Sequence, residues 1–191
     1  RGIRTPADLK GKTVGVPEYQ MTAAVWIRGI LEHESGVPTA SMKWRNGGLE
    51  EPGRHEKVPF TLPPGVELQG IGDERTLNAM LESGEIDALV SARWPSCLGR
   101  SPHVARLFPN FRDAEKAYFK KTGIFPMMHV VGVRKSLLDA HPWLGTSVYK
   151  AFVQAKDLAY PELTQMAALK IALPVLTGQL SASRPSLPPS R

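Results

Sequence analysis

The chain has 191 residues, of which 42% are hydrophobic and 22% are charged, a balance typical of a folded protein rather than a disordered one. No stretch approaches the roughly 20 apolar residues that a membrane-spanning helix needs, and the single cysteine, Cys97, excludes an internal disulfide framework and a multi-cysteine zinc site. The net charge of +6 lies mostly near the two ends of the chain, so nucleic-acid binding is not expected.

The first part of the chain combines short apolar runs with one helical segment. Residues 13–16 predict a buried strand, and the apolar spacing of residues 22–35 predicts a helix that Thr22 caps. Residues 41–45 alternate in polarity and predict a second strand. Residues 46–65 are rich in Gly and Pro and predict a long loop, which in a compact domain is usually functional or disordered.

The next part repeats this alternation of strand and helix. Residues 66–71 and 86–90 predict strands, and a helix over about 73–83, with Asp73 as its cap, lies between them. A polar segment that contains proline, residues 91–102, follows the second of these strands. After these residues, the sequence predicts a helical region over residues 103–121 that is broken at Pro109. It then predicts a strand over 127–133 and three helices over 136–140, 141–158 and 161–173. Such alternation favours an α/β fold with a mostly parallel sheet.

The two ends of the chain differ from its centre. The first residue is Arg1 rather than Met, and nothing near it resembles a signal peptide. The last eleven residues are rich in Ser and Pro and show no core-forming pattern, which predicts a disordered tail.

Candidate ligand-binding residues follow the predicted strands, because ligands of an open α/β sheet collect at the carboxyl ends of its strands. Tyr19, Gln20 and Thr22 lie at a helix start, where free N–H groups and the helix dipole suit a ligand carboxylate. An ordinary capped helix start explains the same residues equally well. After residues 86–90, Arg93 suits bidentate binding of a carboxylate and Pro95 stiffens the loop, although a surface arginine packed on a tryptophan is the alternative.

The histidines and the long loop offer further candidates. His129 lies early in an apolar predicted strand, where it suits an acid, a base or a metal ligand, although a core histidine is the simpler interpretation of the residue alone. In the long loop, Glu50, Glu51, Arg54 and His55 include carboxylate and imidazole groups, but a solvated charged loop is favoured over a metal site. The other histidines are interpreted as surface residues, and no nucleophile elbow or glycine-rich phosphate loop is present.

Four segments carry a resemblance to known proteins. Residues 5–16 (TPADLKGKTVGV) and 84–89 (GEIDAL) resemble the second lobe of type II periplasmic-binding-protein folds. Residues 47–54 (GGLEEPGR) and 122–129 (TGIFPMMH) are more specific, and together the four are similar to the 4,5-dihydroxyphthalate decarboxylase family. The resemblance covers about residues 1–170. Family members are longer, so we expect a fragment that lacks most of the first lobe.

The resemblance implies a type II periplasmic-binding-protein-like α/β fold, with one complete lobe of mostly parallel sheet and C-terminal helices of the partner lobe. On this basis residues 1–128 form the α/β lobe, and residues 129–176 form a return strand and helices that belong to the other lobe. Residues 177–191 then form the disordered tail.

The resemblance also implies a function, the non-oxidative decarboxylation of 4,5-dihydroxyphthalate to 3,4-dihydroxybenzoate, with His129 as the proton donor. The substrate is a small aromatic carboxylate, and the expected location is cytoplasmic. Neither a metal site nor a cofactor is identified, and self-association into a homo-oligomer stays open. The substrate-binding residues assigned in this way are Tyr19, Gln20, Thr22, Glu51, Arg54, Arg93 and Pro95.

Two other interpretations stay open at this point. The same helix start and arginine suit a substrate-binding protein of an ABC transporter for a small aromatic or sulfonate-like anion, which is expected in the periplasm and needs no proton donor. The chain is also compatible with an inactive fragment.

Overall fold

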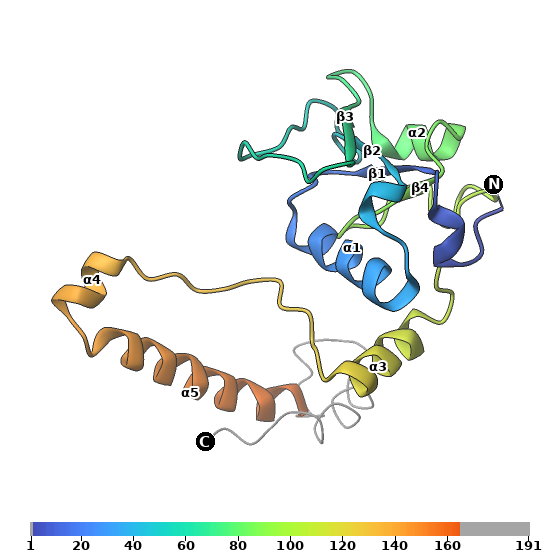
Figure 1. The fold of residues 1–191 in the computed structure, drawn as a ribbon. Coiled ribbons are helices and arrows are strands. Elements are labelled where there is room, and N and C mark those ends of the chain that lie inside the picture. Colours follow the sequence, from blue (N-terminus) through green and yellow to red (C-terminus); the bar gives the residue numbers. More distant parts are fainter. Residues whose placement is uncertain (1, 165–191) are drawn as a thin grey trace. The chain divides into compact units, whose positions relative to one another are not determined.

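The computed structural model describes residues 2–164, which Figure 1 draws in colour. The chain divides into two compact units, Arg1–His129 and Val130–Arg191, which are described separately. The helices and strands of the first unit are β1 (Thr13–Val16), α1 (Thr22–Ser35), β2 (Lys43–Asn46), β3 (Glu67–Gly70), α2 (Leu77–Ser83), β4 (Ala88–Leu89) and α3 (Phe111–Thr122).

The strands form one parallel sheet in the spatial order β3-β2-β1-β4 (Figure 1). On the central strand β1, Val14 lies opposite Trp44 of β2 and Ala88 of β4. Parallel neighbours need a crossover between them, and α1 supplies it from β1 to β2. The structure therefore confirms the predicted α/β fold with a parallel sheet, although β4 has only two residues where residues 86–90 were predicted.

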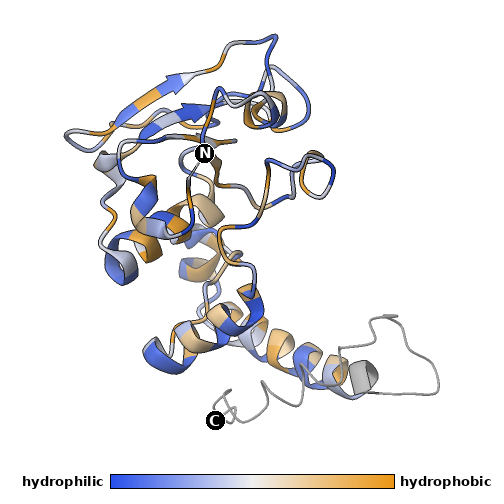
Figure 2. Ribbon diagram, turned by 90° about the vertical axis from the view of Figure 1, so that its right-hand side faces the viewer, coloured by the Kyte–Doolittle hydropathy of each residue, from blue (hydrophilic) through white to orange (hydrophobic). Residues whose placement is uncertain are grey.

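The two faces of the sheet pack against different helices. Val14 and Val16 are fully buried in a cluster with Ala24 and Leu31 of α1. Gly15, between them, faces the other way, since a Cβ atom built on it meets the side chain of Leu77 at the start of α2. This alternation is the two-residue period of a strand. Figure 2 shows hydrophobic and hydrophilic residues on the same helices, as helices with one buried face require.

Both predicted helix caps differ from the structure. The residue before α1 is Met21, which makes no side-chain cap bond, and Thr22 is the first helical residue rather than the cap. Helix α2 begins at Leu77, later than predicted, because Thr76 rather than Asp73 caps it by accepting a hydrogen bond from Ala79 N–H. Asp73 instead pairs with His55, at 2.9 Å. A cap is selected by the local backbone path, and several nearby residues had suitable side chains.

The predicted strand over residues 127–133 is wrong: none of these residues pairs with a strand in the described part of the chain. The apolar side chains of Phe125, Met127 and Val130 are exposed. An indole N–H of Trp26 donates to Met127 C=O at 2.9 Å, which attaches this extended segment to α1. A strand needs a neighbour for its N–H and C=O groups, and β-prone composition does not provide one.

Helical structure in the rest of the chain is partly as predicted. The first part of the predicted region 103–121 is loop, and α3 begins only at Phe111, after Pro109. The second unit contains α4 (Lys135–Ala140) and α5 (Leu144–Thr164), and α5 continues through Pro161 where a separate helix over 161–173 was predicted. The rest of that helix and the predicted disordered tail lie outside the described residues.

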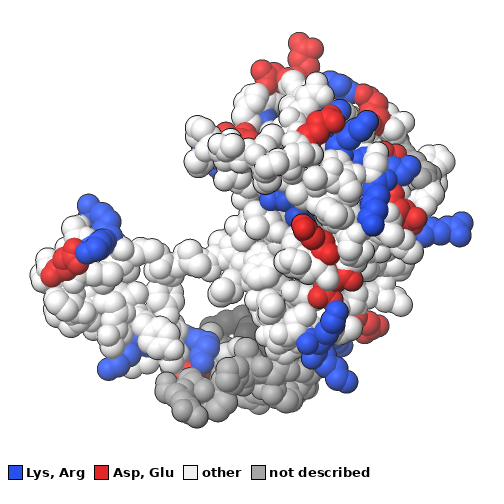
Figure 3. Space-filling model, in the orientation of Figure 1, with Lys and Arg blue, Asp and Glu red and all other residues white. Residues whose placement is uncertain are grey.

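Charged side chains of both signs are intermixed over the face of the first unit in Figure 3. This arrangement differs from the single basic face with which proteins bind nucleic acid. Among the described residues, no helix combines the length and the apolar composition that crossing a bilayer requires.

Candidate functional site

A pocket of about 510 Å³ lies in the first unit and is lined by residues that follow three of the parallel strands. Pro17 and Met21 come after β1, residues 48–54 come after β2, and residues 91–93 come after β4. The carboxyl ends of parallel strands meet at one edge of a sheet, which is where open α/β sheets bind ligands. The predicted substrate-binding residues Glu51, Arg54 and Arg93 all line this pocket, whereas Tyr19, Gln20, Thr22, Pro95 and His129 are not among its lining residues.

Arg54 is bound to a buried carboxylate beside the pocket. Its Nε and Nη2 atoms lie 2.7 and 2.5 Å from Oε1 of Glu18, which is only 7% exposed. Lys57 Nζ lies 3.8 Å from the same oxygen. A buried carboxylate needs such partners because burial removes its hydration. The loop after β2 is thereby attached to the turn after β1.

The turn just before α1 also binds a carboxylate, and that carboxylate comes from the chain itself. Oε1 of Glu56 accepts a hydrogen bond from Tyr19 N–H, and Oε2 accepts one from Gln20 N–H at 3.4 Å. The Gln20 side chain donates to Val58 C=O at 3.0 Å. The sequence predicted that backbone N–H groups near Tyr19 bind a ligand carboxylate. In this structure, those of Tyr19 and Gln20 bind Glu56 instead.

The ring of Tyr19 is part of the core rather than of the pocket wall. Its centroid lies 5.6 Å from that of Trp44 and 5.8 Å from that of Phe60, and its side chain is buried. The Arg28 guanidinium lies over the ring at 3.7 Å and donates to Tyr19 C=O. Burial lowers the pKa of Arg28 from its ordinary value, while the nearby Tyr19 and Glu56 oppose that shift.

Arg93 differs from Arg54 in having a free guanidinium. Within the described residues it forms neither a hydrogen bond nor an ion pair through its side chain, and its backbone N–H donates to Ser91 Oγ at 3.1 Å. Pro95 is half-buried on the same loop, and its C=O accepts a hydrogen bond from Leu98 N–H. An unpaired guanidinium on a pocket wall suits a carboxylate, which it binds through two parallel hydrogen bonds.

Two loops that line the pocket are joined by Glu50, whose carboxylate accepts hydrogen bonds from Ser96 N–H at 2.7 Å and Ser96 Oγ at 2.9 Å. From the sequence, Glu50 was only a weak candidate for a metal ligand, and its contact with Ser96 was not predicted. The two residues are 46 positions apart, so no local spacing predicts their contact. The Glu56 contact with the start of α1 was missed for the same reason.

His129 is the last residue of the first unit and is exposed. Its imidazole forms no hydrogen bond or ion pair with the described part of the chain. Its exposure argues against the core-histidine interpretation, since a core histidine is buried and has a hydrogen-bond partner.

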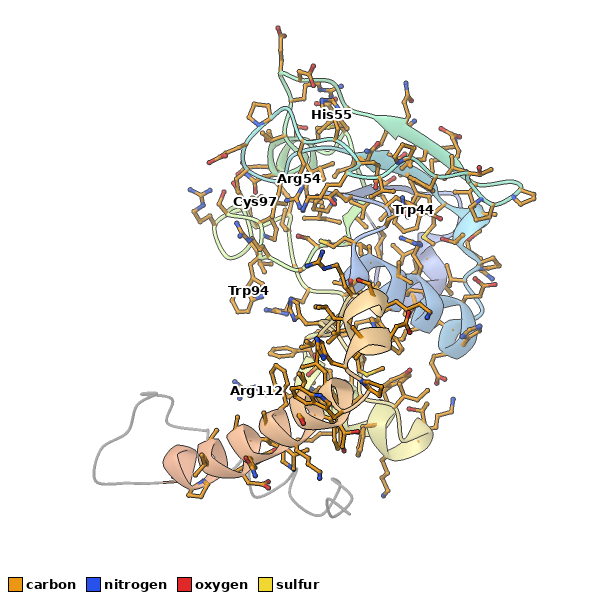
Figure 4. All side chains as sticks on the ribbon, turned by 90° about the vertical axis from the view of Figure 1, so that its left-hand side faces the viewer. Trp44, Arg54, His55, Trp94, Cys97 and Arg112 are labelled. Carbon is orange, nitrogen blue, oxygen red and sulfur yellow. The ribbon has the colours of Figure 1, made fainter. Side chains whose placement is uncertain are left out.

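No group of three or more His, Cys, Asp or Glu residues in the described part of the chain is arranged to hold a metal ion. His55 is engaged with Asp73. In Figure 4, His55 lies nearer the outer edge of the first unit than Arg54 does. The same view labels Trp94 and Cys97, which belong to the loop after β4.

Cys97 is fully buried, and this burial raises the pKa of its thiol from the ordinary value of 9.0. We therefore expect iodoacetamide at pH 8 to alkylate it much more slowly in the native protein than in urea, because the reagent needs an accessible thiolate. Mass spectrometry of timed samples measures both rates. The raised pKa also links folding stability to pH. The stabilisation is complete below pH 9 and is lost as the pH rises above it, because the thiol of the unfolded chain ionises before the buried thiol does. Equal alkylation rates in buffer and urea would contradict the buried position.

Comparison with curated proteins identifies two similar relatives, both named 4,5-dihydroxyphthalate decarboxylase. The one from Comamonas testosteroni is 44% identical over 185 residues, which are 96% of this chain and 56% of the relative. The one from Pseudomonas putida is 43% identical over 121 residues, which are 63% of this chain and 47% of the relative. The chain thus spans about half the length of these relatives. No family model matches it. The identity to two relatives of the same name over most of its length places the chain in the 4,5-dihydroxyphthalate decarboxylase family.

Proposed function

We propose that the protein catalyses the non-oxidative decarboxylation of 4,5-dihydroxyphthalate to 3,4-dihydroxybenzoate. The observation that carries the proposal is the pocket at the carboxyl edge of the sheet, where Arg93 presents a free guanidinium beside Arg54. The names of the two relatives supply the substrate and the reaction class. An aromatic dicarboxylate fits such a wall because an arginine can bind one carboxylate while the other is expelled.

The reaction follows from the substitution pattern of the substrate. Each ring hydroxyl lies para to a carboxylate and donates electron density to the ring carbon that carries it. A general acid protonates that carbon, the electron pair of the carbon–carboxylate bond returns to the ring, and CO2 leaves. We assign His129 as the acid, which then regains a proton from water. Imidazole suits this step because it exchanges protons near neutral pH.

The three predicted residues that line the pocket bind the substrate in this proposal. Arg93 holds the retained carboxylate, and Arg54, although paired with Glu18, adds positive charge to the same wall. Glu51, which also lines the pocket, suits a ring hydroxyl as a hydrogen-bond acceptor. Met21, the residue before α1, also lines the pocket, whereas Pro95 lies further along the loop that carries Arg93. Because Glu56 holds the N–H groups of Tyr19 and Gln20, Arg93 is the principal carboxylate ligand.

We further propose that residues 1–128 are one lobe of a two-lobed, type II periplasmic-binding-protein-like fold. The parallel strand order and the pocket at the strand ends support this lobe. The exposed apolar side chains around Met127 and Val130 support a return segment that pairs with further polypeptide. Helices α4 and α5 support the proposal that residues 129–176 belong to the other lobe. In this arrangement His129 belongs to the segment between the lobes.

One observation favours a second candidate function. The pocket offers arginines to an anion, but His129 does not line it, and a substrate-binding protein of an ABC transporter needs no proton donor. The two candidates also differ in location, which is cytoplasmic for the decarboxylase and periplasmic for the transport protein.

Incubation of the purified protein with 4,5-dihydroxyphthalate tests the proposal. We expect release of CO2 and equimolar 3,4-dihydroxybenzoate, measured by trapped CO2 and by chromatography. Phthalate, which lacks the hydroxyls, is the control ligand, and it is expected to bind without releasing CO2. Binding of both compounds without turnover would support the transport protein instead. Absence of binding and turnover, with native unfolding behaviour, would overturn both and indicate an inactive fragment.

A further inference from the structure

The two loops that carry the pocket residues are joined at a single serine. Glu50, next to Glu51 on the loop after β2, accepts hydrogen bonds from Ser96 N–H at 2.7 Å and Ser96 Oγ at 2.9 Å. Both oxygens of the carboxylate are thereby used. Hydrogen bonds to an ionised acceptor are stronger than neutral ones, so this contact resists thermal displacement of either loop.

Ser96 is held from its other side as well. Arg100 Nε donates to Ser96 C=O at 2.5 Å, and Arg100 Nη2 donates to Ser96 Oγ at 2.8 Å. The next residue, Cys97, is fully buried and its N–H donates to Asn78 Oδ1 at 3.0 Å. The loop after β4 is therefore fixed at two consecutive residues, one attached to helix α2 and the other to Glu50.

The loop that carries Glu50 is attached to the same helix. Leu77 N–H donates to Gly48 C=O at 2.8 Å, and Asn78 N–H donates to Leu49 C=O at 3.0 Å. The first turn of α2 thus binds both loops, and the Glu50–Ser96 contact closes the connection on the side of the pocket. Because α2 packs on the sheet through Leu77, the whole arrangement is tied to the core.

Resting on the proposed function, we infer that Glu50 is a positioning residue that fixes Arg93 at the pocket wall through Ser96. Arg93 lies three residues before Ser96 and has no side-chain partner in the described part of the chain, so its location depends on its backbone. Glu50 does not compete with substrate for Arg93, because its carboxylate is already satisfied. When the backbone that carries Arg93 is already ordered, less conformational entropy is lost as its guanidinium binds a carboxylate.

The test is the affinity of phthalate for a set of variants, measured by isothermal titration calorimetry. Glu50→Ala is expected to weaken binding about tenfold, since two charge-assisted bonds that order the wall are lost. Glu50→Gln keeps one acceptor oxygen and is expected to weaken it by about threefold. The control is Glu67→Ala, which removes an exposed carboxylate paired with Arg45 on the sheet edge, and it should leave the affinity unchanged.

A double-mutant cycle separates positioning from a general structural role. If Glu50 acts through Arg93, Glu50→Ala adds little to the loss caused by Arg93→Ala, whereas independent effects multiply. Multiplicative losses, or an unchanged affinity in Glu50→Ala, would overturn the inference. If Glu50→Ala does not fold, the cycle is run with Glu50→Gln. Failure of the wild-type protein to bind phthalate would instead count against the proposed function, so the two failures are distinguishable.

Discussion

Replacement of His129 by alanine is expected to lower kcat for CO2 release by a factor of about 10² to 10⁴, the usual contribution of a general acid. The reason is that the ring carbon must receive a proton as the carboxylate leaves, and water is a much weaker acid than a placed imidazolium. Affinity for phthalate should stay within about threefold, because His129 is not a residue of the pocket lining. Product formation at saturating substrate and calorimetric titration measure the two quantities.

His33→Ala is the matched control, since His33 is also exposed and lies in the last turn of α1. Its kcat should equal that of the wild type. If His129→Ala leaves kcat unchanged, the proton comes from another group. If it raises KM alone, His129 holds the substrate rather than protonating it.

Replacement of Gly48 by alanine is expected to destabilise the protein by about 3 kcal/mol, a large effect for one added methyl group. A Cβ atom on Gly48 would lie 1.6 Å from the backbone oxygen of Glu51 and 3.2 Å from Cα of Pro52. Both neighbours are backbone, so the turn over residues 48–52 has to open rather than rotate a side chain. Glu51 and Arg54 would then leave the pocket wall, and phthalate binding should be lost.

Gly29→Ala is the control that carries the same chemical change. Nothing lies within 4 Å of a Cβ atom on Gly29, which is in helix α1. Alanine lowers the entropy of the unfolded chain, so this variant should be more stable by about 0.5–1 kcal/mol. Urea unfolding followed by circular dichroism measures both variants. A Gly48→Ala protein as stable as the wild type would show that the turn has another conformation in solution.

The contact of Glu56 with the start of α1 changes how that helix is interpreted. The helix start after the first strand was predicted to bind a ligand carboxylate, whereas in the structure the N–H groups of Tyr19 and Gln20, which precede α1, bind the carboxylate of Glu56. This carboxylate is in the chain itself, and it comes from the long loop. Binding of a ligand carboxylate by these N–H groups stays a prediction, and their contact with Glu56 depends on the path of a loop that local sequence does not specify.

The order of strands and helices in residues 13–90 followed from the sequence, because hydrophobic periodicity and glycine stops are local properties. Thr13–Val16 and residues 22–35 could be predicted in this way, and so could the parallel sheet. The segment around Met127 was mispredicted because a strand exists only beside a partner, which apolar composition does not reveal.

The candidate site depended on contacts between distant residues. From its position after a strand, Arg93 was a candidate carboxylate ligand, with a surface arginine packed on a tryptophan as the alternative. The attachment of its loop to Glu50 spans 46 positions and has no sequence signal. The pairing of Arg54 with Glu18 likewise joins segments that follow two different strands. Local patterns predict which helices and strands form, because the formation of these elements depends largely on residues that are adjacent in the sequence. The tertiary fold alone brings loop residues together, because loop closure and burial set the distances between residues that are far apart in sequence.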